Sequence, residues 1–173
     1  MPELNTINFV IQELEKNLFT FDSLLSNLDQ EQIHFKPEES SWSLLEIVCH
    51  LFDEEREDFR YRIHHILNTP QLSMPPNNPP QWLIDRKYAN QNFADRLAIF
   101  KEERKISLKY LKDLANVNWQ QIYIHPSLGE LSAQFFLHNW LAHDYHHIRQ
   151  INKNNYYYLK SMSNEKLDYA GIW

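Results

Sequence analysis

Glycine and cysteine are almost missing from this chain of 173 residues. Its two glycines, Gly129 and Gly171, leave tight hairpin turns and glycine-rich phosphate-binding loops nearly without the residue they need. The single cysteine, Cys49, excludes an internal disulfide and a zinc site built from cysteines. Because Cys49 follows Ile47 and Val48 in an apolar string, we expect a buried core thiol there. The scarcity of glycine favours an all-helical fold.

Basic residues and long apolar runs are scarce as well. The chain has 17 Lys and Arg against 23 Asp and Glu, a formal net charge of −6, which argues against binding a nucleic-acid backbone. The apolar runs are only a few residues long, so no membrane span is expected. The N-terminal residues lack the basic start and apolar stretch of a signal peptide. We therefore expect a cytoplasmic protein without a nucleic-acid or membrane partner.

Apolar residues make up 43% of the chain, enough for one good core but crowded for two, so residues 1–173 are expected to form a single domain. Four segments show the periodicity of amphipathic helices. They run from about Glu3 to Leu28, Trp42 to Asn68, Asn92 to Ala115 and Gly129 to Asn152. The chain is therefore predicted to be all-α.

The connection from Thr69 to Pro80 contains five prolines, which cannot continue a helix. Up-down bundles usually have short loops, so this length predicts one long crossover between helices that are not simple neighbours. Ser40 or Ser41 is the expected cap of the second segment. Beyond the fourth segment, three consecutive tyrosines and Trp173 are too aromatic for a solvated linker, and we expect them to pack on the bundle or on a second subunit.

His143 and His147 are four residues apart in the fourth segment. Residues at this spacing differ by about 40° in direction on a helix, so two imidazoles can reach one ion from consecutive turns. The pair points into the bundle or its rim, because Trp140 and Ile151 lie on the same side of the helix. Trp140 is expected in the core or in the wall of a pocket. Paired histidines are also common on ordinary surfaces, and catalytic zinc typically needs a third protein ligand.

The remaining histidines are weaker candidates on pattern alone. Six of them lie in expected connections, near a helix end or on faces that diverge from the pair: His34, His125, His64, His65, His138 and His146. His50 lies midway along the second segment, outside the apolar face that contains Leu45, Val48 and Phe52. Periodicity therefore predicts an exposed helical histidine at position 50.

Two acidic residues lie close to these histidines in the sequence. Asp144 follows His143, and we expect it to cap or orient a neighbour, for example as the acceptor for a ligand imidazole, or to be a solvated acid. Glu54 follows His50 by one turn and is either an extra ligand or proton acceptor, or one more charge in the solvated run 53–58. Cys49 is not expected to bind the same ion, since successive helical side chains diverge by about 100°.

Two strings resemble motifs of the DinB-like family. Residues 42–51 read WSLLEIVCHL, which resembles the family's second-helix motif, where a Trp begins the helix and a His followed by Leu supplies the first metal ligand. Residues 128–131 read LGEL and residues 143–151 read HDYHHIRQI, which resembles the last motif, His-Asp-x-x-His-x-x-Gln-Ile. The quoted strings cover about an eighth of the chain, and their order and separation also agree with the family.

The resemblance implies a four-helix bundle with a long crossover, often a homodimer, in which His50, His143 and His147 hold a divalent metal in a cleft. Imidazole suits several metals. Zinc or nickel is expected first, and manganese or iron second. Family members with known activities are metal-dependent thiol transferases and thiol-dependent isomerases. The resemblance therefore predicts a small-molecule substrate and a low-molecular-weight thiol.

Three functions stay open at this point. The first is a metal-dependent enzyme that transfers a thiol to, or hydrolyses, a small electrophilic compound during stress or detoxification. The second is a bundle that binds metal without chemistry, as a sensor or for structure. The third is a dimeric interaction module whose histidines hold no metal. A fold alone does not choose among them, since one fold hosts unrelated functions.

Overall fold

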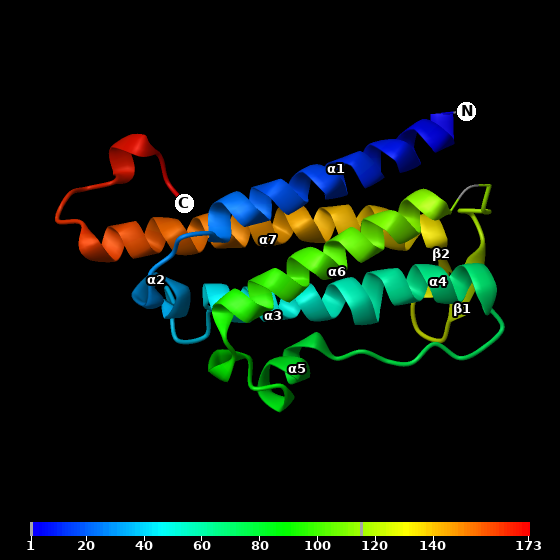
Figure 1. Ribbon diagram of the computed structural model, residues 1–173, viewed down its shortest axis with the longest axis horizontal. Coiled ribbons are helices and arrows are strands. Elements are labelled where there is room, and N and C mark those ends of the chain that lie inside the picture. The colour runs from blue at the N-terminus through cyan, green and yellow to red at the C-terminus, as the bar shows by residue number, and fades with distance from the viewer. Residues whose placement is uncertain (1, 115) are drawn as a thin grey trace.

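The computed structural model describes residues 2–114 and 116–173. Four long helical stretches form a bundle: α1 (Pro2–Leu25), α3 (Leu44–Glu54) continued by α4 (Arg60–Asn68), α6 (Phe93–Asp113) and α7 (Ala133–Met162). Figure 1 shows α1 and α7 running in one direction and α3–α4 and α6 in the other. Helix α1 packs on α6 and α7, α3 packs on α6, and α4 packs on α7. The predicted all-α four-helix bundle is confirmed.

The second long stretch begins at a capping box that the sequence already contains. The Ser43 hydroxyl accepts a hydrogen bond from the Glu46 amide at 3.3 Å, and the Glu46 carboxylate accepts one from the Ser43 amide at 2.8 Å. These two bonds satisfy donors that the first turn leaves free. The cap is therefore Ser43, and the prediction of Ser40 or Ser41 was wrong.

A π-helical turn, η1 (Glu55–Phe59), joins α3 to α4 in the middle of the acidic run. The run was expected to be solvated, but Asp53, Glu54, Glu55 and Asp58 are all buried. Three of these carboxylates pair with arginines, which offsets the cost of removing them from water. Their partners are Arg86 for Asp53, Arg104 for Glu55 and Arg62 for Asp58.

The crossover returns the chain along the bundle, so that α6 starts near the start of α3 (Figure 1). It includes two short helices, α5 (Pro79–Asp85) and η2 (Tyr88–Asn90), that pack on α3. Pro79 and Pro80 begin α5 instead of excluding a helix, because the first helical positions need no amide hydrogen. The long crossover itself is as predicted.

The first and third segments differ from the prediction mainly at their ends. Helix α1 stops at Leu25, and the polar connection after it contains a short helix, α2 (Gln30–His34). Helix α6 starts after Asn92, whose side chain accepts from the Asp95 amide at 3.0 Å. The predicted end of this segment, Ala115, lies outside the described residues.

The fourth segment does not begin as predicted. Gly129–Ser132 forms a strand, β2, that pairs antiparallel with β1 (Ile122–His125) in a hairpin. Gly129 has φ of +76°, a left-handed conformation that glycine adopts without a steric penalty. One glycine was therefore enough for a turn that we expected to be nearly unavailable. Helix α7 starts after Ser132, whose hydroxyl accepts from the Phe135 amide at 3.0 Å, and extends past Asn152.

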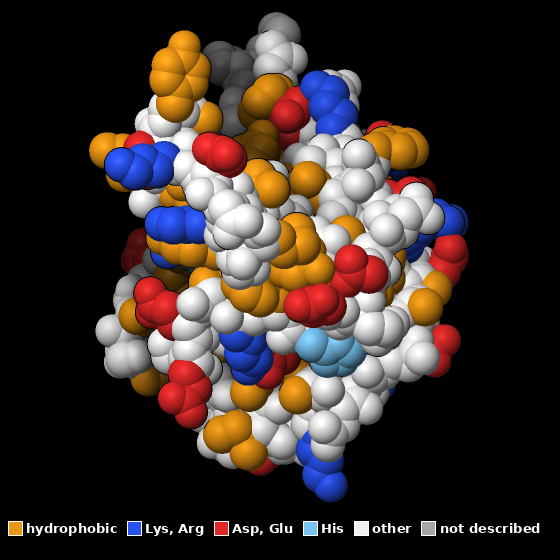
Figure 2. Space-filling model, turned by 90° about the vertical axis from the view of Figure 1, so that its left-hand side faces the viewer, with side chains coloured by type: hydrophobic (Ala, Val, Ile, Leu, Met, Phe, Trp, Pro, Cys, Tyr) orange, Lys and Arg blue, Asp and Glu red, His pale blue; other side chains and the backbone are white. Residues whose placement is uncertain are grey.

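The tyrosines expected in a tail belong to α7, and Tyr158 is buried. Of the residues that follow α7, Trp173 stacks on Tyr156 with ring centroids 5.4 Å apart, whereas Tyr169 and Ile172 are almost fully exposed. Charged and hydrophobic side chains are interspersed on the end of the bundle where α7 finishes (Figure 2). Within residues 2–114 and 116–173, no helix combines the length and apolar composition that a membrane crossing requires.

Candidate metal centre

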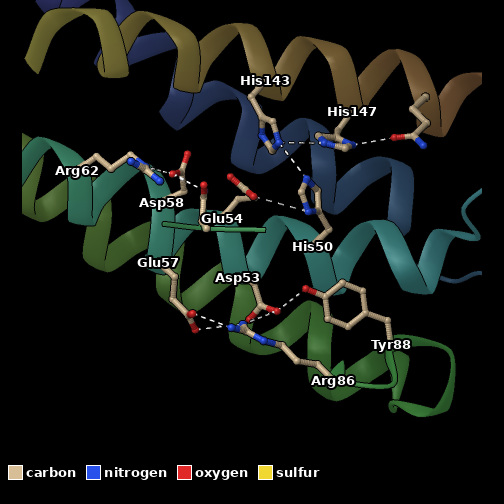
Figure 3. A network of polar contacts seen from close by, with 12 residues as sticks. His50, Asp53, Glu54, Glu57, Asp58, Arg62, Arg86, Tyr88, His143 and His147 are labelled. Carbon is tan, nitrogen blue, oxygen red and sulfur yellow. Dashed lines mark hydrogen bonds and ion pairs between the residues drawn. The ribbon is translucent and has the colours of Figure 1, made fainter. Parts of the chain in front are cut away.

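The three histidines named above lie together between α3 and α7 (Figure 3). The Nε2 atom of His143 lies 3.1 Å from Nε2 of His50 and 3.0 Å from Nε2 of His147. One nitrogen from each ring lies within 4.8 Å of the other two. We call these three side chains the histidine cluster.

The expectation from periodicity that His50 would be exposed was wrong, since the residue is 6% exposed. Helix α3 packs on α2, α5, α6 and α7, so every residue from Leu44 to Glu54 is buried. A helical wheel identifies a buried face only where another face meets water. The family motif, which does not depend on amphipathicity, identified His50 where the wheel did not.

Burial keeps the histidine cluster uncharged. It lowers the pKa of His50 to about 3 and that of His147 to about 4, and it lowers the pKa of His143 well below its ordinary value. The neighbouring imidazoles lower these pKa values further, because a second positive charge nearby is unfavourable. At neutral pH all three rings are therefore neutral, the form in which histidine binds metals.

Hydrogen bonds among the three rings cannot satisfy every Nε2 atom of the histidine cluster. Nδ1 of His147 lies 2.8 Å from Oε1 of Gln150, an acceptor, so the proton of His147 is on Nδ1 and its Nε2 carries a lone pair. If Nε2 of His143 donates to that lone pair, it cannot also accept from His50. A cation between the rings accepts all three lone pairs. Tetrahedral zinc with bonds of about 2.0–2.1 Å holds its nitrogen ligands about 3.3 Å apart. This is close to the 3.1 and 3.0 Å that separate Nε2 of His143 from those of His50 and His147. The residues present therefore fit a divalent metal ion.

The cluster lines a cavity of about 650 Å³ between α3, α7 and the crossover. Trp42 is in the wall and meets the His50 ring edge-on at 4.9 Å. Asn77, Pro79 and Pro80 of the crossover and Lys153 of α7 line other parts. A cavity of this size accommodates a small-molecule ligand.

The sequence profile of the DinB superfamily matches residues 13–151. This chain belongs to the DinB superfamily. Among solved structures it is similar to YfiT from Bacillus subtilis, described as a probable metal-dependent hydrolase with an unusual four-helix bundle topology, at a TM-score of 0.75. The sequences are 18% identical, and the alignment covers 86% of this chain and 85% of that one, so the likeness shows the fold. A comparison with curated proteins found no match.

Glu54 lines the same cavity and is 4% exposed, so it is not one more charge in a solvated run. Its Oε1 lies 3.9 Å from Nδ1 of His50. Burial raises the pKa of Glu54 well above its ordinary value, and the neighbouring Asp58 raises it further. At neutral pH the Glu54–Asp58 pair therefore retains a proton more readily than two exposed carboxylates would.

Asp144 is fully buried on the other side of α7, which excludes a solvated acid. Its carboxylate accepts two hydrogen bonds of 2.7 Å from Arg104 and one of 3.1 Å from Asn17. Arg104 also donates to Glu55 at 2.8 Å, and the second oxygen of Glu55 accepts from the Trp140 indole at 3.1 Å. We call these five residues the arginine network. Asp144 thus orients Arg104 instead of a ligand imidazole, and Trp140 lies in the core.

Sequence reasoning did not predict the roles of Gln150 and Arg104. Gln150 was quoted as part of the DinB-like motif, but periodicity gave it no role. Arg104 occupies a core position in α6 between Phe100 and Leu108, and an arginine at such a position is the signal that could have identified the network.

The other histidines lie outside the histidine cluster. His34 lies in α2 and His125 in β1 instead of in connections. His146 is exposed and lines the same cavity as the histidine cluster. His65 is buried, with Nε2 3.0 Å from the Leu72 carbonyl. Cys49 is buried as expected, and burial raises the pKa of its thiol to about 12.

Proposed function

We propose that this member of the DinB superfamily is a divalent-metal-dependent enzyme that transfers a low-molecular-weight thiol to a small electrophilic compound, or hydrolyses such a compound, in stress or detoxification. His50, His143 and His147 are the proposed ligands, with zinc or nickel preferred over manganese or iron. The observation that carries the proposal is the convergence of three neutral imidazoles on the wall of a cavity of about 650 Å³. Three protein ligands leave a coordination position free for an exchangeable ligand.

A bound divalent cation supplies Lewis acidity, which brings the pKa of a coordinated water or thiol toward neutrality. The protein holds the imidazoles neutral by burial and fixes His147 through Gln150. Trp42 lines one side of the site, edge-on to the His50 ring and nearly parallel to the His147 ring. A reacting thiol must come from outside the chain, since the only cysteine, Cys49, is buried and its thiol pKa is about 12.

The test compares wild type with two histidine-to-alanine variants, one in the histidine cluster and one outside the cavity. Metal-free protein is loaded separately with zinc, nickel, manganese or iron. Consumption of a small thiol with an aromatic chloride electrophile is measured, and so is hydrolysis of an activated ester. We expect a metal-dependent rate in wild type and in His64→Ala, a control at an exposed histidine of α4 that does not line the cavity, and a rate at least about tenfold lower in His147→Ala, which lacks one metal ligand.

Equal rates in wild type and His147→Ala would remove the proposal. Metal that raises the melting temperature without supporting either reaction would instead favour a sensor or structural role.

The predicted homodimer is part of the proposal. Phe9 and Phe19 on α1 are 53% and 71% exposed, which is consistent with a further apolar contact. Light scattering during size-exclusion chromatography measures the mass directly. A monomeric mass would contradict the homodimer and leave the metal chemistry untouched.

A further inference from the structure

Two imidazoles of the histidine cluster differ in how their second nitrogen is held. Nδ1 of His147 has an acceptor, Oε1 of Gln150 at 2.8 Å. Nδ1 of His50 is buried without a hydrogen-bond partner among the described residues. Oε1 of Glu54 is also buried and without such a partner, and it lies 3.9 Å from that nitrogen. Two unsatisfied atoms of complementary type thus face each other in the interior, where an unmade hydrogen bond is costly.

The two side chains are one turn apart on α3, and the Glu54 carboxylate points toward the His50 ring (Figure 3). Closing the gap to a hydrogen bond needs a movement of about 1 Å. A cation on Nε2 favours this movement, because the ring is then fixed with its proton on Nδ1 and becomes a stronger donor. Metal-bound histidines almost always donate this proton to a carboxylate, carbonyl or water.

Ligation by Glu54 fits the geometry less well. The nitrogens that converge in the cluster are Nε2 atoms, whereas Glu54 lies beside Nδ1 of His50. The two nitrogens of an imidazole point to different sides of the ring. A carboxylate next to Nδ1 therefore lies away from the position where the three Nε2 lone pairs meet.

We infer that Glu54 is a positioning residue for His50, whose Nδ1–H it accepts when Nε2 binds the metal. This inference rests on the proposed function, because it takes the histidine cluster as the metal site. Glu54 is itself held by a hydrogen bond to Asp58, which pairs with Arg62 and accepts from Asn77 at 2.7 Å. Asn77 belongs to the crossover. A chain of polar contacts thus connects the crossover to His50.

The test measures zinc affinity of metal-free protein by competition with a chromophoric chelator. It compares Glu54→Gln with Glu57→Gln, the same change one turn along the chain at a partly exposed residue that pairs with Arg86. Glu54→Gln keeps an acceptor oxygen but cannot ionise when the metal binds, so we expect affinity at least about threefold below that of Glu57→Gln. Glu54→Ala removes the acceptor, and we expect a loss of about 10–100-fold.

Proton NMR of the zinc-loaded protein supplies a readout that a purely structural role would not move. We expect a protected Nδ1–H signal from His50 in wild type, a shifted signal in Glu54→Gln and no protected signal in Glu54→Ala, while the His147 signal persists. Equal zinc affinities of Glu54→Gln and Glu57→Gln would overturn the inference. That result is distinct from failure of the proposed function, in which zinc-loaded wild type has no activity.

Discussion

Two adjacent residues of helix α7, His143 and Asp144, lie in two different polar environments on different sides of the helix. Asp144 lies in the arginine network, where its contacts with Arg104 and Asn17 are 2.7 to 3.1 Å long. His143 lies in the histidine cluster, where two further imidazole nitrogens approach it within about 3 Å and no carboxylate pairs with it among the described residues. The arginine network is enclosed in the protein interior, whereas the histidine cluster lines a cavity.

The difference separates two uses of buried polar groups. In the arginine network, nearby carboxylates outweigh the effect of burial and raise the pKa of Arg104, so the guanidinium stays charged and joins α1, α6, α7 and η1. In the histidine cluster, burial lowers the pKa values and the rings stay neutral with lone pairs available. We therefore expect the network to stabilise the fold and the cluster to bind a ligand.

The largest effect is expected from Arg104→Met, which leaves Asp144 and Glu55 buried without their cation. Breaking a buried ion pair on one side costs about 3–5 kcal/mol, so the free energy of unfolding should fall by that amount. Urea denaturation of metal-free protein measures it. Lys105→Met, at the exposed neighbouring position, is the matched control and should change the unfolding free energy by less than about 0.5 kcal/mol. Similar stabilities of the two variants would show that the network is not a structural clamp.

An intermediate effect is expected from Gln150→Leu, which removes the acceptor of the His147 Nδ1–H. The proton can then move to Nε2, and zinc affinity should fall about tenfold. The competition assay with a chelator measures it. Gln150→Glu retains an acceptor and should restore affinity to at least the wild-type value. If Gln150→Leu binds zinc as wild type does, Gln150 does not position the ligand.

The smallest effect is expected at Cys49, which packs in the hydrophobic core with Ile33, Leu45 and Tyr88. Because the pKa of its thiol is raised to about 12, almost no thiolate is present at pH 8 in the folded protein. A disulfide reagent such as dithionitrobenzoate should react with it only after unfolding in urea. Cys49→Ala should retain metal affinity within about twofold. Rapid reaction of native protein would contradict the burial of this thiol.

The sequence predicted some residues of these two regions and not others. The spacing of His143 and His147 places them on one side of a helix, and that follows from helical geometry. His50 required the family motif, because α3 is buried on all sides and shows no exposed face for contrast. The partner of Asp144 could not be predicted, since Arg104 comes from α6, 40 residues away along the chain.

Local structure was predictable where local hydrogen bonds decide it. The start of α6 follows from its cap Asn92, and the capping box at Ser43 and Glu46 was visible in the sequence although Ser40 and Ser41 were chosen. The β1–β2 hairpin was missed because its strands are four residues each, too short for a clear alternation of apolar residues.

Metal content tests the central claim most directly. Protein purified without an affinity tag is analysed for bound elements in wild type, His50→Ala and the exposed control His64→Ala. We expect one divalent metal ion per chain in wild type and His64→Ala, and a large loss of metal in His50→Ala. Wild type without stoichiometric metal, or His50→Ala with the same occupancy as wild type, would contradict the assignment of the histidine cluster as a metal site.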